Sequence, residues 1–342
     1  MRLLVTGGAG FIGSHVVEYY ARKGAEITVF DNLCRAKLLK KDEKNALFNW
    51  NYIRANYPKV KLVKGDVADC IALKEAGKDC DTIIHTAAQT AVTTSVVEPE
   101  PDFWANALGT FNVLEVARKN NARVVYCSTN KVYGDNVNKV EIAEGKNRYS
   151  FKSSNGIQET FPIDLCEHTP YGCSKLTGDL YTQDYAHLYG LKTGVFRMSC
   201  IYGTRQFGVE DQGWVAWFTI ATMLGKPITI YGDGKQVRDV LYVSDLVGLY
   251  DKFLSSKIRH GVWNTGGGNE KTMSLLELLD ILEKLTGRRS KVSFSDWRPS
   301  DQKVYISDIS KVQKELGWKP NVKPEEGVKK LVDWVNANKA VF

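Results

Sequence analysis

The feature that most constrains the fold is the run TGGAGFIG, which begins at Thr6 and directly follows the apolar segment RLLV. It places Gly7, Gly10 and Gly13 between a predicted strand and a predicted helix. Glycines allow a tight turn there and let backbone N–H groups approach a pyrophosphate at the helix N-terminus. The next apolar segment ends at Asp31, 31 − 13 = 18 residues after Gly13, close to the spacing of about 20 expected for a ribose-binding acid. The run therefore predicts a dinucleotide site rather than a plain strand-to-helix turn.

The residues around this turn also favour one dinucleotide over another. A carboxylate at Asp31 would repel a 2′-phosphate, which favours NAD over NADP. Arg35 and Lys37 could accept such a phosphate, but we interpret them as surface charges. No Gly-Lys-Ser/Thr follows the glycines, so the turn is not a nucleotide-triphosphate loop.

Apolar runs alternate with amphipathic segments through the first two thirds of the chain. Such alternation predicts an α/β fold, in which helices cover both faces of a doubly wound parallel sheet. The predicted strands lie within residues 2–8, 26–32, 60–66, 81–88 and 122–129, and helices within 11–24 and 109–121. The segment 34–58 is predicted to be a solvated helical insertion.

The chain changes character near residue 204, where aromatics, glycines and turn signals become frequent. We expect one domain over residues 1–203, to which 236–262 returns, and a smaller α/β substrate lobe over 204–342. In this lobe, residues 274–287 predict a helix with a capping box from Ser274 to Glu277. Residues 308–320 predict another helix, capped by Asp308 and stopped by Gly317.

Composition limits the function classes. A net charge of +7 from 46 basic and 39 acidic residues suits phosphorylated substrates, and no basic run interleaved with aromatics predicts nucleic-acid binding. The seven scattered cysteines and five histidines show no metal-ligand spacing, so we expect no metal and inert thiols. No apolar run is long enough for a membrane span, and no signal peptide is apparent. We expect a cytoplasmic protein.

The run PYGCSK places Tyr171 and Lys175 four residues apart, on one face of a predicted helix. An ammonium beside the phenol, together with the positive nicotinamide of NAD⁺, would lower the pKa of Tyr171 and make it a base. In STNKVYGD, a strand end supplies the hydroxyl of Thr129, which could share the proton of a substrate alcohol. Together with the upstream glycine turn, these residues predict a dehydrogenase-type site rather than an exposed helical pair.

These motifs resemble the extended short-chain dehydrogenase/reductases that modify nucleotide sugars, and the resemblance spans essentially the whole chain. It rests on TGGAGFIGSH, STNKVYG, PYGCSK, FRMSCIYG, GDGKQVRDVLYVSDL and the late WRPSDQKVYISDISKVQKELGWKP. It implies a Rossmann-type domain that retains NAD, a C-terminal lobe that holds a nucleotide diphosphate, and a homodimer or homotetramer formed through helices that include the Tyr171 helix. The cofactor contacts that we expect are Gly7, Gly10, Phe11, Ile12, Gly13, Asp31, Asn32, Arg35, Asp66, Val67, Thr86, Ala87, Ala88, Gln89, Asn106, Ser128, Tyr171 and Lys175.

The resemblance also suggests substrate contacts. Arg238 and Arg298 would grip the diphosphate, a bidentate task that suits guanidinium. Alternatives are open for three of these residues. Thr90 could be a packing residue, Trp214 could be part of the core or of a lid, and Lys235 could be a solvated charge. The substrate contacts that we expect are Thr90, Val92, Thr129, Asn130, Ser199, Cys200, Arg205, Gln206, Gln212, Trp214, Lys235, Arg238 and Arg298.

The residues after Thr129 bear on the reaction. Family members that dehydrate the sugar carry Asp-Glu at these positions, whereas this chain has Asn130 and Lys131, which cannot serve as the acid and base of an elimination. No motif for recognising the carboxylate of a uronic acid supports decarboxylation. Redox-neutral epimerisation needs only a triad that activates a hydroxyl, and Thr129, Tyr171 and Lys175 supply one.

The run IYGTRQFGVEDQGWVAWF narrows the resemblance to the CDP-sugar 2-epimerases, which invert C2 of a CDP-linked 3,6-dideoxyhexose. Where 4-epimerases usually place Asn, this chain has Ser199 and Cys200, which fits a sugar docked differently, although neutral drift in a loop would look the same. The expected substrate is therefore a nucleotide sugar linked to CDP. The alternatives are a UDP-sugar 4-epimerase and a non-catalytic NAD-sensing protein on the same fold.

Overall fold

The computed structural model describes residues 1–35, 43–298 and 301–342, and the chain divides into two compact units. The first unit comprises Met1–Val132, Thr169–Arg197 and Val247–Trp263. The second comprises Tyr133–His168, Met198–Leu246 and Asn264–Phe342. These bounds differ from the predicted division at three places. The chain passes into the second unit from Tyr133 to His168, leaves the first unit again after Arg197 rather than after residue 203, and returns at Val247 rather than at residue 236.

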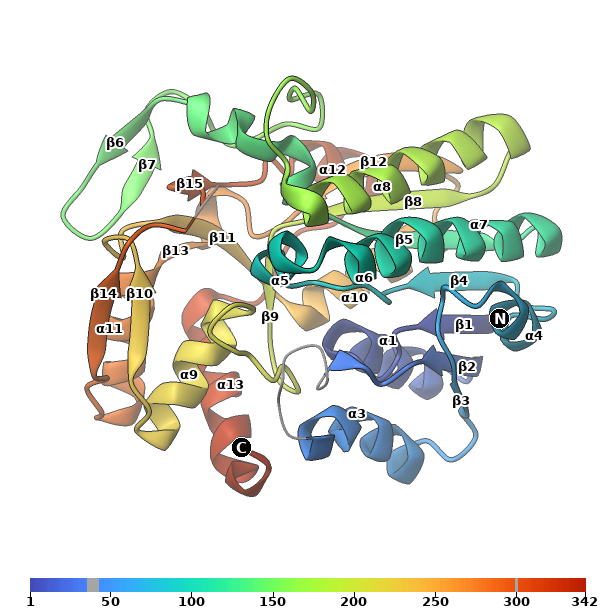
Figure 1. Ribbon diagram of the computed structural model, residues 1–342, viewed down its shortest axis with the longest axis horizontal. Coiled ribbons are helices and arrows are strands. Elements are labelled where there is room, and N and C mark those ends of the chain that lie inside the picture. The colour runs from blue at the N-terminus through green and yellow to red at the C-terminus, as the bar shows by residue number, and fades with distance from the viewer. Residues whose placement is uncertain (36–42, 299–300) are drawn as a thin grey trace. The chain divides into compact units, whose positions relative to one another are not determined.

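The first unit is built on a seven-stranded sheet with the order β12-β8-β5-β4-β1-β2-β3 (Figure 1). The strands β1, β2, β3, β4 and β5 pair in parallel. The strand order reverses between β1 and β4, which makes this a doubly wound sheet with a topological switch point beside β1. This confirms the predicted fold class. The strands are β1 (Arg2–Thr6), β2 (Glu26–Asp31), β3 (Lys61–Lys64), β4 (Thr82–His85), β5 (Arg123–Thr129), β8 (Thr193–Met198) and β12 (His260–Thr265).

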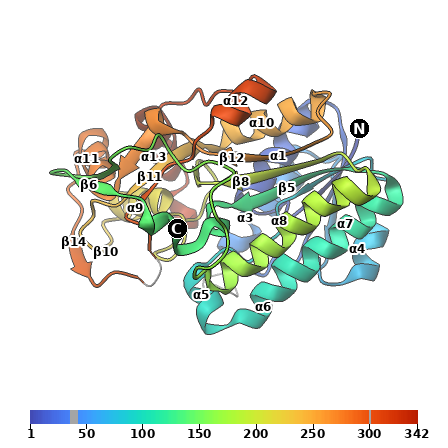
Figure 2. The same ribbon diagram turned by 90° about the horizontal axis from the view of Figure 1, so that it is seen from above.

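Helices cover both faces of this sheet, with α4, α7 and α8 on one side and α1 and α10 on the other (Figure 2). The central side chains of β1, β2, β4 and β5 are mostly apolar because both faces are covered. Leu4, Ile83 and Val124 of adjacent strands, for instance, are buried in one cluster with Val113 and Leu114 of α7. The helices are α1 (Phe11–Arg22), α3 (Glu43–Asn56), α4 (Cys70–Ala76), α5 (Val92–Val97), α6 (Pro99–Phe103), the π-helical η1 (Trp104–Leu108), α7 (Gly109–Asn120), α8 (Thr169–Tyr189) and α10 (Val243–Ser255), which ends in this unit.

The helix α3 lies in the segment that the sequence predicts to be a solvated insertion. That prediction is wrong for one face of the helix, because Trp50 and Ile53 are buried and α3 packs on α1. Asn49 of α3 also donates a hydrogen bond to the carbonyl of Gly10 at 3.3 Å. The helix α3 therefore supports the glycine turn, whereas residues 36–42 of the predicted insertion lie outside the described residues.

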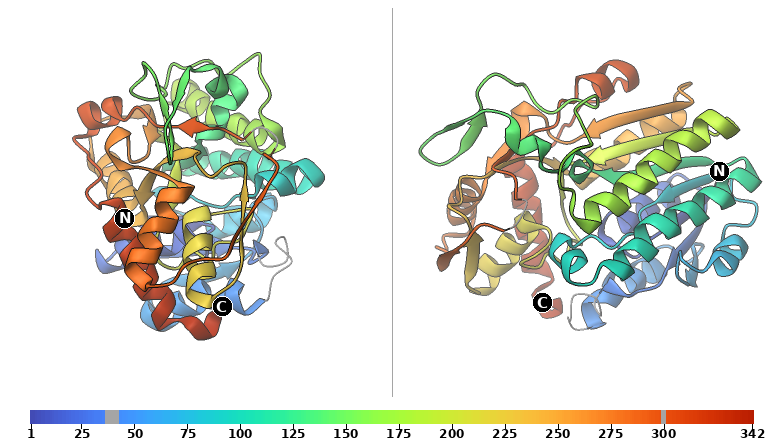
Figure 3. Two further views of the ribbon diagram at one scale, coloured as in Figure 1. Left: turned by 90° about the vertical axis from the view of Figure 1, so that its left-hand side faces the viewer. Right: turned by 45° about the horizontal axis from the view of Figure 1, so that its top comes forward.

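The second unit contains short strands and a group of helices. Strand β11 pairs with β9, β13 and β15, β10 pairs with β14, and β6 forms a hairpin with β7. Helices α9, α11 and α13 pack on one another (Figure 3). The elements are η2 (Asn130–Lys139), which begins in the first unit, β6 (Ile142–Glu144), β7 (Tyr149–Phe151), β9 (Cys200–Tyr202), α9 (Trp214–Leu224), β10 (Ile228–Tyr231), β11 (Val237–Tyr242), η3 (Asn269–Lys271), β13 (Thr272–Ser274), α11 (Leu275–Thr286), β14 (Val292–Ser295), β15 (Val304–Tyr305), α12 (Ser310–Leu316), α13 (Pro324–Ala337) and η4 (Lys339–Val341).

The helix ends test the predicted caps. The capping box is confirmed, since the Ser274 hydroxyl accepts from the Glu277 N–H and the Glu277 carboxylate accepts from the Ser274 N–H. Gly317 ends α12 in the left-handed conformation, as predicted. The N-cap of α12 is Ile309 rather than Asp308, whose carboxylate still accepts from the Ser310 N–H at 2.9 Å. Among the described helices, none has the length and apolar character that crossing a bilayer requires.

Candidate functional site

The glycine turn between β1 and α1 has the close backbone packing that a dinucleotide site requires. Gly7 adopts a positive φ of 69°, and its N–H donates to the Phe30 carbonyl at 2.8 Å. A Cβ at Gly13 would lie 2.2 Å from the Gly7 carbonyl oxygen, so no other residue fits there without opening the turn. The turn thus keeps a cradle free of side chains at the start of the helix, which fits a bound pyrophosphate.

The first turn of α1 supplies the matching electrostatics. Its N-cap Gly10 brings no side-chain acceptor, and the first turn holds no acidic residue. The backbone N–H groups and the positive end of the helix dipole are therefore available to an anion. Phe11 and Ile12, predicted cofactor contacts, begin this helix and are both half-buried.

The acid that ends β2 and the acid that follows β3 are held by hydrogen bonds from nearby residues. Asp31 accepts from the N–H groups of Ala9 at 2.9 Å and Leu33 at 2.8 Å. Burial raises the pKa of Asp31, and these two hydrogen bonds lower it. Asp66 accepts from the Asn32 amide at 2.8 Å, which joins the two loops. The geometry suits Asp31 as the acceptor for ribose hydroxyls.

Other predicted cofactor residues use their side chains inside the protein. Thr86 donates to the carbonyls of Thr6 and Gly7, and Ala87 lies against Gly7. The Asn106 side-chain amide accepts a hydrogen bond from the Gln89 N–H and donates one to the Gln89 carbonyl. Val67, also in the predicted set, is buried with its side chain next to Gly109. Ala88 and Arg35 are half-buried, so Arg35 is not the surface charge that we expected. Lys37 lies outside the described residues.

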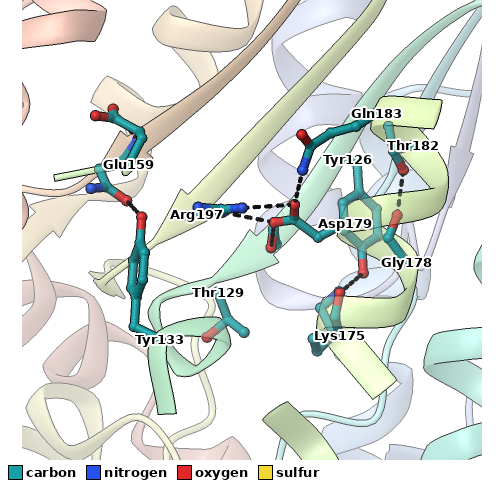
Figure 4. A network of polar contacts seen from close by, with 12 residues as sticks. Tyr126, Thr129, Tyr133, Glu159, Lys175, Gly178, Asp179, Thr182, Gln183 and Arg197 are labelled. Atoms are coloured by element: carbon teal, nitrogen blue, oxygen red, sulfur yellow. Dashed lines mark hydrogen bonds and ion pairs between the residues drawn. The ribbon is translucent and has the colours of Figure 1, made fainter. Parts of the chain in front are cut away.

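The predicted catalytic residues lie together in the first unit. Thr129 ends β5, and α8 presents Tyr171 and Lys175 one turn apart. Tyr126 of β5 donates to the Lys175 carbonyl at 3.0 Å, and the Lys175 ammonium lies 4.4 Å from the centre of the Tyr126 ring (Figure 4). A Cβ at Gly178 would lie 2.3 Å from the Tyr126 hydroxyl, so this glycine lets α8 approach the strand.

Burial dominates the acidity of this site. It raises the pKa of Tyr171 to about 12, while a hydrogen bond with Thr129 lowers it. Burial lowers the pKa of Lys175 to about 8. Asp102 and Cys127 also raise the pKa of the phenol, and Lys175 is not among the groups that lower it in the protein alone. A positive charge next to the phenol, such as an oxidised nicotinamide, would favour the phenolate.

The contacts that fix α8 were not predicted from the sequence, which named only Asn106 among these residues, as a cofactor contact. Ser174 donates to the buried Asp102 of α6, and Asn106 donates to the same carboxylate at 3.0 Å. The Ser95 hydroxyl accepts from the Tyr171 N–H at 3.1 Å. Asp102 ends the run Glu-Pro-Glu-Pro-Asp, so nothing in its immediate sequence distinguishes it from the two acids before it. They hold the helix segment that carries Tyr171 and Lys175.

The two arginines expected to bind the diphosphate both lie in the second unit, each beside an acid. Arg238 bonds to Asp301 at 2.8 Å, and Arg298 bonds to Asp211 at 2.8 Å. The Arg298 guanidinium also lies 3.9 Å from the centre of the Tyr231 ring. Both guanidinium groups are thus oriented in advance, with part of their donor capacity used by the acids.

The Ser199–Cys200 pair takes part in buried contacts of the second unit. The Ser199 hydroxyl donates to the carboxylate and the carbonyl of Asp239, so it is engaged within the protein. Burial raises the pKa of the Cys200 thiol to about 12, although Arg238 and the Trp214 indole lower it. Cys200 therefore acts as a neutral, half-buried side chain between two predicted substrate contacts.

The remaining predicted substrate contacts are divided between the units. In the first unit, Thr90 is exposed, Val92 begins α5, and the Asn130 amide oxygen accepts from the Thr129 hydroxyl at 3.3 Å. In the second unit, Lys235 pairs with Glu144 at 2.5 Å. Also in the second unit are Arg205 and Gln206, which are buried, Gln212, which bridges to Val209, and Trp214, which begins α9.

The second unit also contains a hollow of about 390 Å³. Its polar lining includes Asp135, Asn138, Arg298, Asp301 and Lys303, and Trp297 supplies an aromatic wall. Arg298 is the one predicted substrate contact in this lining. The hollow has a size and a mixed lining that are common for small-ligand sites.

Comparison with known proteins places these features in a family. Residues 3–266 match the model of the NAD dependent epimerase/dehydratase family. The chain is 40% identical to the CDP-paratose 2-epimerase of Salmonella typhi over 98% of its own length and 100% of that protein.

Solved structures agree with this match. The UDP-glucose 4-epimerase of Thermus thermophilus, solved with NAD, is 31% identical, has a TM-score of 0.81 and covers 98% of this chain and 99% of its own. The UDP-glucose 4-epimerase of Thermotoga maritima, solved with UDP-glucose, is 29% identical, has a TM-score of 0.82 and covers 99% of this chain and 100% of its own.

Proposed function

The chain belongs to the NAD dependent epimerase/dehydratase family, and we propose that it inverts C2 of a CDP-linked hexose, of the type that converts CDP-paratose to CDP-tyvelose. It is an enzyme of the epimerase type, and its cofactor is NAD. The main support for an epimerase is that Thr129, Tyr171 and Lys175 lie together in the first unit. The two positions where dehydratases carry the acid–base pair Asp-Glu are Asn130 and Lys131 in this chain. This set can move the proton of an alcohol but cannot eliminate water.

Each of the three side chains has a role in this proposal. The Tyr171 phenolate takes the proton of the C2 hydroxyl, and the Thr129 hydroxyl, which lowers the pKa of the phenol, orients that alcohol. The Lys175 ammonium offsets negative charge at the phenol and can bond the nicotinamide ribose. NAD⁺, held by the glycine turn and Asp31, would supply the hydride acceptor for C2 and then the hydride donor for the opposite face of that carbon.

The residues of the first unit fit that cofactor. The uncapped N-terminus of α1, the side-chain-free turn of Gly7 and Gly13, and Asp31 at the end of β2 supply contacts for a pyrophosphate and a ribose. Arg238 and Arg298 of the second unit would hold the diphosphate of the sugar nucleotide.

The choice of C2 and CDP rests on the relative from Salmonella typhi, which matches over its entire length at 40% identity. The Ser199–Cys200 pair supports it, because Ser199 is bound to Asp239 and offers the sugar no amide. The alternative is a UDP-sugar 4-epimerase, which the similarity to the two solved 4-epimerases favours. An NAD-sensing protein without activity is a weaker alternative, since the three catalytic side chains are intact.

Product analysis tests the proposal. The purified enzyme is incubated, without added cofactor, with CDP-paratose and with UDP-glucose, and the products are read by NMR. We expect inversion at C2 of the CDP sugar, with no deuterium from solvent at that carbon, because the hydride never leaves the site. Inversion at C4 of the UDP sugar alone would favour the alternative, and deuterium at C2 would exclude transient oxidation.

Replacement of Tyr171 tests the base. Tyr171→Phe removes the phenol oxygen and keeps the ring, so we expect turnover to fall by a factor of about 10³, with NAD binding retained. Turnover and bound NAD, measured on the same sample, check this. Unchanged turnover would remove Tyr171 from the role, and no turnover in the wild type with any nucleotide sugar would favour the sensing alternative.

We also propose that the enzyme works as a homodimer, in the cytoplasm, without nucleic-acid or membrane partners. The support for a dimer is a row of exposed apolar side chains on helices α7 and α8, which run side by side (Figure 3). They include Phe111, Leu180, Tyr181, Leu188 and Tyr189. A homotetramer is the alternative, since Val97 of α5, Phe103 of α6 and Trp104 of η1 are exposed as well. All seven cysteines are free thiols, which suits a reducing compartment.

A further inference from the structure

Asp179 is a buried acid of the first unit for which the reaction provides no direct role. It lies on α8 one turn after Lys175 and is completely buried. A buried carboxylate is costly unless it is fully paired. The side chains that pair with it therefore indicate what it does.

Four hydrogen bonds from three elements reach this carboxylate (Figure 4). Arg197 of β8 donates to both oxygens, at 3.0 and 3.1 Å. Gln183, one turn further along α8, donates at 2.6 Å. Ser128 of β5 donates at 2.6 Å, so its hydroxyl is engaged by Asp179 and is not free for the cofactor.

The position of Ser128 gives this network its importance. Ser128 directly precedes Thr129, whose hydroxyl lowers the pKa of the Tyr171 phenol. Tyr171, Lys175 and Asp179 are spaced by four residues and therefore share one face of α8. Asp179 thus joins the strand end that carries one member of the triad to the helix that carries the other two.

Stability alone does not explain such a pair. Buried ion pairs give little net stability compared with apolar side chains of the same size, because both charges lose their hydration. Their directional bonds do fix the relative position of the elements that they join. The bonds to Ser128 and Arg197 fix β5 and β8 against α8, whereas the bond to Gln183 stays within the helix.

We propose that Asp179 is a positioning residue that, through Ser128, holds the Thr129 hydroxyl at Tyr171. The proposal rests on the proposed function, because it assigns Asp179 to the triad of that reaction. Arg197 acts with it as the counter-charge that allows the carboxylate to be buried.

The test compares two variants that each remove one hydrogen bond from the same carboxylate. Ser128→Ala separates β5 from Asp179, and Gln183→Ala serves as the matched control because its bond lies within α8. Asp179→Asn is less useful, since it leaves the buried Arg197 without a counter-charge and can fail to fold. We expect similar decreases in melting temperature for the two variants.

Activity should separate them. Only Ser128→Ala should lower kcat, by about tenfold, with the KM for the sugar nucleotide unchanged. In this variant the increase of kcat with pH should also begin at a higher pH than in the wild type. The reason is that the contact with Thr129, which lowers the pKa of Tyr171, is weakened. Amide hydrogen exchange at Thr129–Val132, which needs no substrate, should become faster in Ser128→Ala alone.

Two results would overturn the proposal. Equal kcat, pH profile and exchange in the two variants would show that Asp179 only stabilises the fold. Weaker NAD binding in Ser128→Ala would make Ser128 a cofactor contact instead. A wild type that epimerises no nucleotide sugar would sink the proposed function, while the exchange measurement would still decide whether Asp179 holds the strand end.

Discussion

Lys175 illustrates how burial sets the chemistry of single residues in this protein. Its side chain is 2% exposed, and burial lowers its pKa to about 8. Three groups work in the opposite direction, namely Cys127 of β5, Asp102 of α6 and Asp179 on α8 itself. His85 of β4 also faces this site, but burial lowers its pKa to about 3, so it is neutral between Thr6 and Thr110. The charge of Lys175 in the working range of pH therefore depends on its acidic neighbours.

The first prediction concerns Asp102. Asp102→Asn keeps an acceptor for Ser174 but removes a negative charge that raises the pKa of Lys175. The ammonium, which is present below its pKa and lost above it, should then be lost at a lower pH. We expect the alkaline fall of kcat/KM to move down by about one pH unit.

A pH–rate profile of the NAD-loaded enzyme measures this shift. Asp184→Asn is the matched control, because Asp184 is an exposed acid on the same helix α8. An unchanged alkaline limb in Asp102→Asn would mean that Asp102 does not govern the charge of Lys175.

At the scale of elements, the strand–turn–helix unit of β1 and α1 depends on close approach of backbone atoms. Gly13 lies inside the first turn of α1, where a Cβ would meet the backbone of both Gly7 and Gly8. Gly248 lies inside α10, and a Cβ there would meet no atom within 4 Å. Packing thus requires glycine at position 13 of α1, whereas it does not require glycine at position 248 of α10.

The second prediction uses this contrast. Gly13→Ala should destabilise the protein by about 1–3 kcal/mol, the usual cost of forcing an extra methyl group into a packed site, and should abolish detectable NAD binding. Gly248→Ala should be neutral or slightly stabilising, because alanine favours helix more than glycine does. Denaturant unfolding and NAD titration of both variants check this, and normal NAD binding by Gly13→Ala would refute the role of the turn.

At the scale of the whole molecule, the exposed apolar row on α7 and α8 is a feature that a single chain does not explain. Tyr181 is 44% exposed and Leu188 67% exposed, and the Phe111 and Tyr181 rings lie 5.9 Å apart. A patch of this kind on helices suits an isologous contact, in which two copies use the same surface. The same helix α8 carries Tyr171 and Lys175, so dimer formation would also steady the catalytic helix.

The third prediction is that Tyr181→Asp yields a monomer. The introduced carboxylate would be buried without a partner in the contact, which should weaken dimerisation by at least about 2 kcal/mol. Ile71→Asp on α4, which replaces a residue that is 78% exposed outside the row, is the control. Light scattering after size exclusion should give a dimer for the wild type and Ile71→Asp; a dimeric Tyr181→Asp would show that the row serves another purpose.

Some properties follow from the sequence because they depend on neighbours along the chain. A glycine run between a strand and a helix, four residues between Tyr171 and Lys175, and Ser274 three residues before Glu277 fix their geometry locally. For this reason the parallel α/β fold, the pairing of Tyr171 with Lys175 on one helical face and the capping box were all predictable.

Other properties were decided only by tertiary structure, because the partners are distant in sequence. Ser128 and Asp179 are 51 residues apart in the sequence, and Ser199 and Asp239 are 40 residues apart. A periodic pattern in the sequence therefore cannot predict that these two hydroxyls form hydrogen bonds inside the protein. The buried face of α3 and the passage of residues 133–168 into the second unit depend likewise on what each segment meets after folding. The sequence by itself therefore predicts which chemical groups the site contains. Which of these groups are free to react depends on burial and on hydrogen-bond partners, and a chain acquires both only when it folds.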